Sequence, residues 1–336
     1  MLIHWIRTKS RDRFGSRPIW IKAVSCVKET DHNKQQCATK GNFLTRAVLT
    51  IIGAMFSFSL MGVVVRVLTE DYSVFQISFT RNVFGFFPIL FLLAYSQKMK
   101  ALKMPFLRQE WLLCIIRGTS VAVAQLCLFV AYSRLEFATV GTLIFSGPFF
   151  VTALSVPLLG ARVGFWRWSA VLMGFGGVVM IMQPSTGIFS LFSVLPVLAA
   201  LCYATSSTLV KLFSANHLSG VIQFRSQIFA TGCSLFLWLC FGEATPIASA
   251  LDLGLFLVLG FLGGIGVLGL VVAYRMSQPS LLAPFEYFGI PFALFFGWWF
   301  FAEAPIERLF PGVLAIVAAG LVIVWRQMKL NKDSSH

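Results

Sequence analysis

Three arginines and one glutamate interrupt long apolar runs of this 336-residue chain. Arg81, Arg117 and Arg225 each lie about six residues inside a run, and Glu286 lies near the middle of another, in LLAPFEYFG. If such a run spans a bilayer, a charge at its centre costs roughly 2.5–3.5 kcal/mol on insertion scales, so the side chain usually faces a cavity or a partner. These four residues are candidates for lining a polar path; snorkelling to the interface and structural ion pairing are the alternatives.

The surroundings of Glu286 favour a cavity. Pro284 precedes it and Gly289 follows it, and both residue types loosen a helix and free backbone carbonyls. We hypothesise that Glu286 carries a coupling proton or pairs with one of the arginines; a purely structural salt bridge is the alternative. Phe285 lies directly beside it, where a flat ring could stack.

Amides and tyrosines within the same runs extend the candidate set. Gln76, Gln125 and Gln223 could bind a solute or could only tie helices together, an interaction worth about 0.6 kcal/mol on average. Four tyrosines divide in the same way between cavity lining and an interfacial belt. They are Tyr132, Tyr203, Tyr274 and Tyr287, of which Tyr274 joins the candidates.

Motifs for phosphate, dinucleotide or metal chemistry are missing or lie in the wrong context. GIGVLG at 264–269 fits the dinucleotide pattern, but it lies within an apolar run and is better interpreted as a close helix-packing face. The sequence has no phosphate-binding G-x-x-x-x-G-K-[ST], and its four histidines have no metal-ligand spacing. We therefore expect no catalytic residue, no metal and no cofactor.

Composition indicates that a lipid bilayer is the chain's main environment. Of its residues, 57% are hydrophobic and 12% charged, whereas soluble domains have roughly 45–50% and about 25%. The net charge of +14 does not indicate nucleic acid, because ten of the 27 Lys and Arg residues precede residue 47 and most others lie between apolar runs. That distribution is typical of the cytoplasmic side of a membrane protein.

Ten apolar runs are long enough to span a membrane, which takes about 20 residues. They are 47–68, 75–96, 111–133, 138–159, 164–183, 190–212, 219–241, 252–274, 279–301 and 306–326. Residues 1–46 are expected to form a basic, poorly ordered tail, and residues 327–336 a second tail. With the N-terminus inside, 21 Lys and Arg residues fall inside and two outside, so both termini are expected in the cytoplasm.

An internal repeat relates the two halves. LFVAYSRL at 128–135 resembles LVVAYRMS at 270–277, and the same offset of 142 brings Ala161 opposite Glu303. Each unit contains five spans, an odd number, so the second unit enters the membrane from the opposite side. The sequence thus predicts two inverted five-helix repeats, 47–184 and 190–326, an arrangement typical of secondary transporters.

The runs at 137–184 and 280–325, which begin FATVGTLIF and SLLAPFEYF, resemble the EamA domain of the drug/metabolite transporter superfamily. The resemblance implies a ten-helix carrier in the bacterial inner membrane that moves small metabolites without ATP. One departure stands out. Members usually have Leu-Gly-Glu after the fourth span, whereas this chain has Leu159-Gly160-Ala161 and keeps an acid only at Glu303.

The resemblance also orders the expected substrates. Uptake of riboflavin comes first, followed by export of amino acids or related metabolites and by uptake of S-adenosylmethionine. The alternative outside transport is an integral membrane enzyme acting on a lipid-like substrate. The repeat and the scarcity of catalytic groups favour transport, while the sequence indicates no direction of net flux.

Overall fold

The computed structural model describes residues 32–96, 98–103, 106–160, 164–182, 191–214, 217–247, 249–277 and 282–303, with positions 312, 314, 315 and 318. Every regular element within these residues is a helix, which confirms an all-α protein for this part of the chain. The predicted tenth span, 306–326, lies outside the described residues apart from those four positions. Residues 1–31 and the tail 327–336 also lie outside them.

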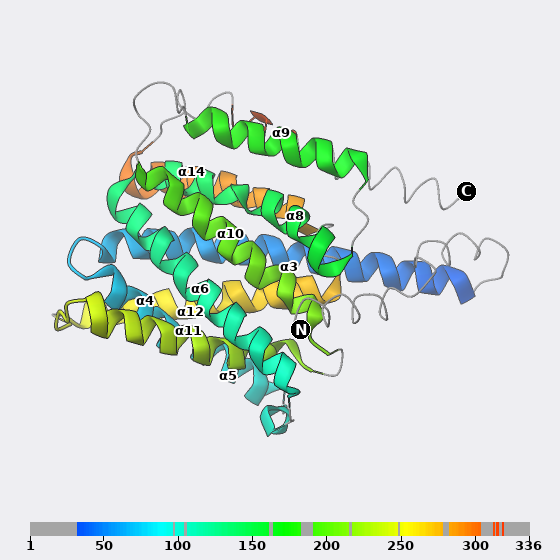
Figure 1. Cartoon of the computed structure of the whole chain (residues 1–336), viewed down its shortest axis with the longest axis horizontal. Coiled ribbons are helices and arrows are strands. Elements are labelled where there is room, and N and C mark those ends of the chain that lie inside the picture. Colours follow the sequence, from blue (N-terminus) through cyan, green and yellow to red (C-terminus); the bar gives the residue numbers. More distant parts are fainter. Residues whose placement is uncertain are drawn as a thin grey trace.

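The described α-helices follow one another along the chain as shown in Figure 1. They are α3 (His32–Leu68), α4 (Val74–Phe84), α5 (Phe86–Tyr95), α6 (Arg108–Arg134), α7 (Phe137–Leu143), α8 (Gly147–Leu159), α9 (Phe165–Met182), α10 (Val194–Leu209), α11 (Ser219–Phe241), α12 (Ala250–Met276) and α14 (Gly289–Phe301). Short 3₁₀ helices are η1 (Met99–Lys103), η2 (Ile144–Ser146), η3 (Leu191–Ser193), η4 (Val210–Leu212) and η5 (Ala283–Phe288). Because α3 begins at His32, residues 32–46 of the expected tail are helical.

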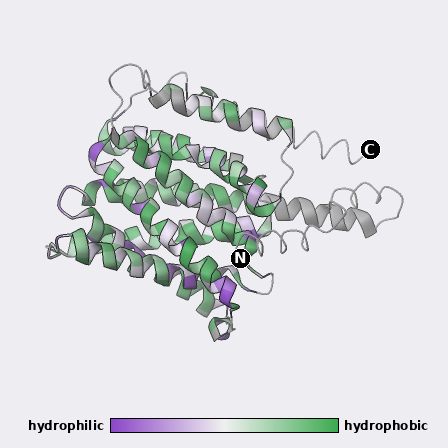
Figure 2. Cartoon of the chain, in the orientation of Figure 1, coloured by the Kyte–Doolittle hydropathy of each residue, from purple (hydrophilic) through white to green (hydrophobic). Residues whose placement is uncertain are grey.

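Seven segments of the described chain are long and apolar enough to cross a membrane. They are Thr45–Leu68, Val74–Tyr95, Arg108–Arg134, Thr139–Leu159, Val194–Leu212, Ser219–Phe241 and Ala250–Met276, and Phe285–Phe301 is a shorter apolar helix. Figure 2 shows hydrophobic residues along nearly the whole length of these helices, with hydrophilic residues mainly near their ends. Helices that are hydrophobic all round must be buried in protein or lipid, so the fold is that of a multi-pass membrane protein.

Two of the spans are interrupted where glycine and proline occur. Gly85 separates α4 from α5, and η2 separates α7 from α8, which begins at Gly147-Pro148. Proline has no N–H to donate to the preceding turn, so Pro88 and Pro148 each leave the ladder of backbone bonds incomplete. Irregular backbone at membrane depth is tolerated where it is buried in protein or lines a cavity.

The bundle is built around two long helix pairs. α12 packs along α3, and α10 packs along α6 (Figure 1). α11 and α4 complete the side of the bundle next to α6 and α12, and α9 lies at the opposite edge against α7 and α8. The inner faces of α3, α6, α10 and α12 therefore point towards a common centre.

Glycines on α12 allow its backbone to touch neighbouring helices. A Cβ on Gly260 would lie 2.8 Å from the carbonyl carbon of Phe84, and one on Gly264 would lie 2.8 Å from the carbonyl oxygen of Gly85. Small residues at such crossings bring membrane helices into close van der Waals contact. The glycine-rich run of α12 thus serves helix packing against the junction of α4 and α5.

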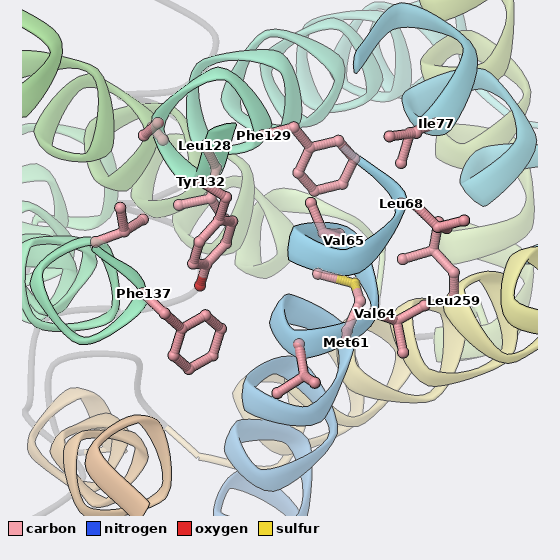
Figure 3. Close-up of a cluster of buried hydrophobic side chains, with 14 of the residues drawn as sticks. Met61, Val64, Val65, Leu68, Ile77, Leu128, Phe129, Tyr132, Phe137 and Leu259 are labelled. Carbon is pink, nitrogen blue, oxygen red and sulfur yellow. The ribbon is translucent and has the colours of Figure 1, made fainter. Parts of the chain in front are cut away.

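A cluster of buried apolar side chains packs α3, α6 and α12 together (Figure 3). Val65 of α3, Phe129 of α6 and Leu259 of α12 are almost wholly buried in it. Tyr132 and Phe137 belong to this cluster, and their rings are stacked with 5.3 Å between centroids. These two aromatic residues connect the core to the cavity described next.

Candidate functional site

A cavity lies between α3, α6, α10 and α12 and is closed on one side by α7, η2, α8, η5 and α14. It holds about 1060 Å³ of empty space, a figure that includes its open mouth. Most of the wall is apolar, and its polar members are Ser59, Arg117, Tyr132, Tyr203, Ser206, Ser207, Tyr274 and Glu286.

Arg117 brings a fixed positive charge to this wall. Its side chain, on α6, is 2% exposed, and its Nε donates to the carbonyl of Ser206 on α10 at 3.3 Å. The next residue, Gly118, lies against α11 so closely that a Cβ there would be 2.9 Å from the backbone nitrogen of Ala230. One donor of the guanidinium is therefore held by α10, and the backbone of α6 beside it is packed tightly against α11.

Glu286 supplies the carboxylate of the cavity. It lies in η5, and its Oε1 accepts a hydrogen bond from the hydroxyl of Tyr274 on α12. A Cβ placed on Gly147 would lie 3.8 Å from Oε2 of Glu286, so this oxygen faces the broken helix at the start of α8. The carboxylate thus links the end of α12 to a segment of irregular backbone, where changes of hydrogen bonding can move a helix.

The structure brings three of the sequence candidates together and places the others elsewhere. Arg117, Tyr274 and Glu286 line the same cavity. The remaining candidates are absent from its described wall: Arg81, Arg225, Gln76, Gln125, Gln223 and Phe285.

Arg81 belongs to a buried polar network outside the described wall of the cavity. It is 1% exposed, its Nη1 donates to Oδ1 of Asn82 at 3.0 Å, and a Cβ on Gly263 would lie 2.7 Å from its Nη2. Asn82 in turn donates to Gln125 at 2.9 Å and accepts from Gln227 at 3.0 Å. This network joins α4, α6, α11 and α12. Gln125 therefore ties helices together, which is one of the two roles considered for it from the sequence.

The other two amides also bond to protein groups. Gln223 donates to Gln227 at 3.1 Å within α11. Gln76 exchanges two hydrogen bonds with the backbone of Thr245, at 2.7 and 3.0 Å, and so holds the loop after α11 against α4. Their contacts are those of structural amides.

Arg225 and Phe285 likewise contact protein rather than the cavity. The guanidinium of Arg225 lies 3.9 Å from the ring centroid of Phe106 and 4.9 Å from that of Trp111, and its Nη2 donates to the carbonyl of Leu102 at 2.8 Å. Such stacking stabilises a cation away from water. Phe285 is partly buried against the apolar cluster of α3 and α12.

Sequence reasoning missed the small hydroxyl residues of the wall, Ser59, Ser206 and Ser207. The signal was present on α10, where Thr205, Ser206, Ser207 and Thr208 follow one another within an apolar run. A hydroxyl can satisfy itself by bonding its own helix, so such residues are weak indicators of a site.

One polar cluster, here called the Arg66 cluster, ties helix ends beside the cavity. Arg66 at the end of α3 donates to the carbonyl of Tyr132 and, at 2.8 Å, to that of Leu135. Its Nη2 lies 3.7 Å from Oε1 of Glu303, whose Oε2 accepts from the N–H of Phe137 at 2.6 Å. Since Tyr132 and Phe137 line the cavity, this cluster holds α3, α6, α7 and the end of α14 together at one end of it.

A second cluster, the Arg275 cluster, does the same at the other ends of α6, α10 and α12. Lys211 donates to the carbonyl of Arg275 at 3.1 Å, and Arg275 donates to the carbonyls of Ser214 and His217 at 3.1 and 2.7 Å. Glu110 accepts from the N–H of Ser214 at 3.1 Å and lies 3.0 Å from Nε2 of His217. The neighbouring Val210 and Tyr274 line the cavity, so the two clusters lie at its opposite ends.

Fold and site together define the class of protein. It is a multi-pass helical membrane protein whose helices surround a mostly apolar cavity, with one arginine and one glutamate on the described wall. Residues 45–183 match the EamA-like transporter family. The resemblance found in the sequence is thereby confirmed.

Named relatives agree with this placement. A riboflavin transporter of Rhizobium johnstonii is 27% identical over 306 residues, which cover 90% of this chain and 98% of the relative. The pseudopaline exporter CntI of Pseudomonas aeruginosa is 28% identical over 287 residues, 84% of this chain and 97% of the relative. An S-adenosylmethionine uptake transporter of Rickettsia felis is 25% identical over 297 residues, 86% of this chain and 97% of the relative.

A crystal structure at 15% sequence identity superposes on this fold with a TM-score of 0.63, covering 87% of this chain and 99% of the other. At that identity the likeness concerns the fold alone. The family match and the relatives support a transporter function, and the apolar helices support a multi-pass membrane protein.

Proposed function

We propose that this transporter carries a small polar metabolite with a flat ring system through the cavity, and that riboflavin uptake is its first candidate function. The observation that carries the proposal is the wall itself, where Arg117 and Glu286 stand on a mostly apolar and aromatic surface. Apolar walls suit the faces of the flavin ring, and a few placed polar groups suit its carbonyl edge and its hydroxylated chain. Among the relatives, the riboflavin transporter of Rhizobium johnstonii is similar over 90% of this chain.

We further propose ten spanning helices in two inverted repeats, 47–184 and 190–326, with both termini in the cytoplasm. The helix contacts support this arrangement. In the proposed repeats α3 corresponds to α10 and α6 corresponds to α12, and the contact of α3 with α12 is matched by the contact of α10 with α6. The backbone supports it too. Gly160 ends α8 at φ 62° and Ala302, 142 positions later, ends α14 at φ 53°. The 3₁₀ segments η2 and η5 precede Gly147 and Gly289, which are also 142 positions apart.

Transport in this proposal alternates between openings at the two ends of the cavity. Opening one end requires the Arg66 cluster to separate, and opening the other requires the Arg275 cluster to separate. Glu286 is the group proposed to exchange a coupling proton. Its ionised carboxylate accepts a hydrogen bond from the hydroxyl of Tyr274, and protonation of the carboxylate would change this bond. The bond joins α12 to η5, so a change of protonation would be felt by both elements.

Purified protein in liposomes tests the proposed function. Uptake of riboflavin, S-adenosylmethionine and amino acids is measured side by side, and the internal solute is identified chemically. Saturable entry of unmodified riboflavin, exceeding the other solutes, is the expected result. Entry of another solute instead would reject riboflavin, and a covalently altered product would favour the membrane-enzyme alternative.

A further inference from the structure

Arg117 is distinguished within the cavity by a donor that the protein leaves unused. Of the residues on the described wall, it is the one that holds a buried side-chain N–H without an acceptor, namely Nη1. A buried polar group is normally hydrogen-bonded, and leaving a charged one unmatched is costly. Such a group in a ligand cavity is accounted for if the ligand supplies the acceptor.

The charge of Arg117 is equally unmatched. No carboxylate of the described residues lies within ion-pair distance of its guanidinium. The carboxylate that shares the wall, Glu286, already accepts a hydrogen bond from Tyr274 through Oε1. A guanidinium is protonated at neutral pH, so the cavity keeps a positive charge at this point under transport conditions.

One donor of the guanidinium is already bound before any solute arrives. Nε is held by the carbonyl of Ser206 on α10, and α6 is pressed against α11 at Gly118. The planar group therefore presents the far side of its fork, which includes Nη1, in one direction. A fixed, planar, positively charged fork is suited to two acceptor atoms in one plane, which it binds through parallel hydrogen bonds.

We infer that Arg117 determines solute specificity by binding a coplanar pair of acceptor atoms on the transported molecule. This inference rests on the proposed function of the cavity as the substrate site. In a flavin, the pair is the ring nitrogen N1 and the adjacent carbonyl oxygen O2; in an amino acid or a metallophore it is a carboxylate. A lysine would bind either acceptor as a point charge, without selecting for the planar pair.

Flavin analogues test the inference on the solute side. Binding of riboflavin, 1-deazariboflavin and 5-deazariboflavin to the full-length protein in lipid nanodiscs is followed by flavin fluorescence or calorimetry. The 1-deaza analogue has a C–H in place of the N1 acceptor, whereas the 5-deaza analogue is altered at the far side of the ring. We expect the 1-deaza analogue to bind about tenfold or more weakly and the 5-deaza analogue within about twofold of riboflavin.

Arg117→Gln tests the same contact on the protein side. We expect riboflavin to bind about tenfold or more weakly and the difference between riboflavin and 1-deazariboflavin to vanish. Arg117→Lys should bind riboflavin more tightly than Arg117→Gln does, but it should distinguish riboflavin only weakly from 1-deazariboflavin. Arg225→Gln is the matched control, because it removes a membrane arginine that is not on the cavity wall, and it should leave both quantities unchanged.

The outcomes separate this inference from the riboflavin proposal. The role of Arg117 is overturned if wild-type protein binds riboflavin and 1-deazariboflavin equally well. It is also overturned if Arg117→Gln still binds riboflavin more tightly than 1-deazariboflavin. If wild-type protein binds no flavin, the same comparison is made with S-adenosylmethionine and its carboxamide. If wild-type protein prefers S-adenosylmethionine to its carboxamide and Arg117→Gln removes that preference, the role of Arg117 stands and riboflavin is rejected as the substrate. If wild-type protein binds neither flavins nor S-adenosylmethionine, both proposals are overturned. The analogue comparison needs only wild-type protein, so a variant that fails to fold does not prevent the test.

Discussion

Replacing Glu303 with alanine removes the carboxylate that joins three helix ends. Its Oε2 accepts from the N–H of Phe137, the first residue of α7, at 2.6 Å, and its Oε1 lies 3.7 Å from Arg66. An acceptor at a helix N-terminus contributes about 0.5–2 kcal/mol, its negative charge near the helix dipole about 0.3–1 kcal/mol, and a partly exposed ion pair about 0–1 kcal/mol. We therefore expect Glu303→Ala to lower the free energy of unfolding by about 1–3 kcal/mol.

Glu303→Gln separates these contributions, because the amide oxygen can still accept from Phe137 while the charge is lost. Its expected cost is about 0.5–1 kcal/mol. Thermal unfolding of purified protein in detergent measures both variants, with Glu243→Ala as an exposed acidic control. A glutamine variant as unstable as the alanine variant, or an alanine variant as stable as wild type, would refute the assignment of Glu303 as a helix-end acceptor.

Three further predictions follow from the cavity and its surroundings. Glu286→Gln should change the pH dependence of transport, and Tyr274→Phe should change it too; normal rates with an unaltered pH profile would exclude Glu286 from proton coupling. Gly263→Leu should destabilise the protein by about 1–3 kcal/mol, because a side chain there meets Arg81, whereas Gly254→Ala, with nothing within 4 Å, should not. Arg81→Ala should lower stability but leave solute affinity within about twofold, measured by unfolding and by binding, because Arg81 lies off the cavity wall.

The membrane class of the protein could be predicted from composition because lipid imposes a strong constraint. Apolar runs of about 20 residues have few interpretations other than spanning helices. Their interruptions were harder to place. The run 138–159 changes to a 3₁₀ turn at η2, just before Gly147-Pro148, yet glycine and proline are common in regular membrane helices as well.

Depth in the membrane could be predicted for the charged residues, but not the direction in which they point. Arg81, Arg117 and Arg225 lie at similar depths in their runs, and only Arg117 reaches the cavity. A helix that is apolar on all sides has no amphipathic pattern to reveal its inner face. The stacking of Arg225 on Phe106 depends on a residue more than a hundred positions away, which local sequence cannot indicate.

Blocking the cavity tests the central claim, that solute passes between α3, α6, α10 and α12. Val121 lines the cavity from α6, whereas Val123, two positions later on the same helix, is 39% exposed on its outer surface. Riboflavin flux into liposomes is compared for wild type, Val121→Trp and Val123→Trp, each first shown to be folded by thermal unfolding. The account predicts flux in wild type and Val123→Trp and a loss of at least about tenfold in Val121→Trp, because an indole fills the space that the solute needs. Wild-type flux in a folded Val121→Trp protein would contradict it.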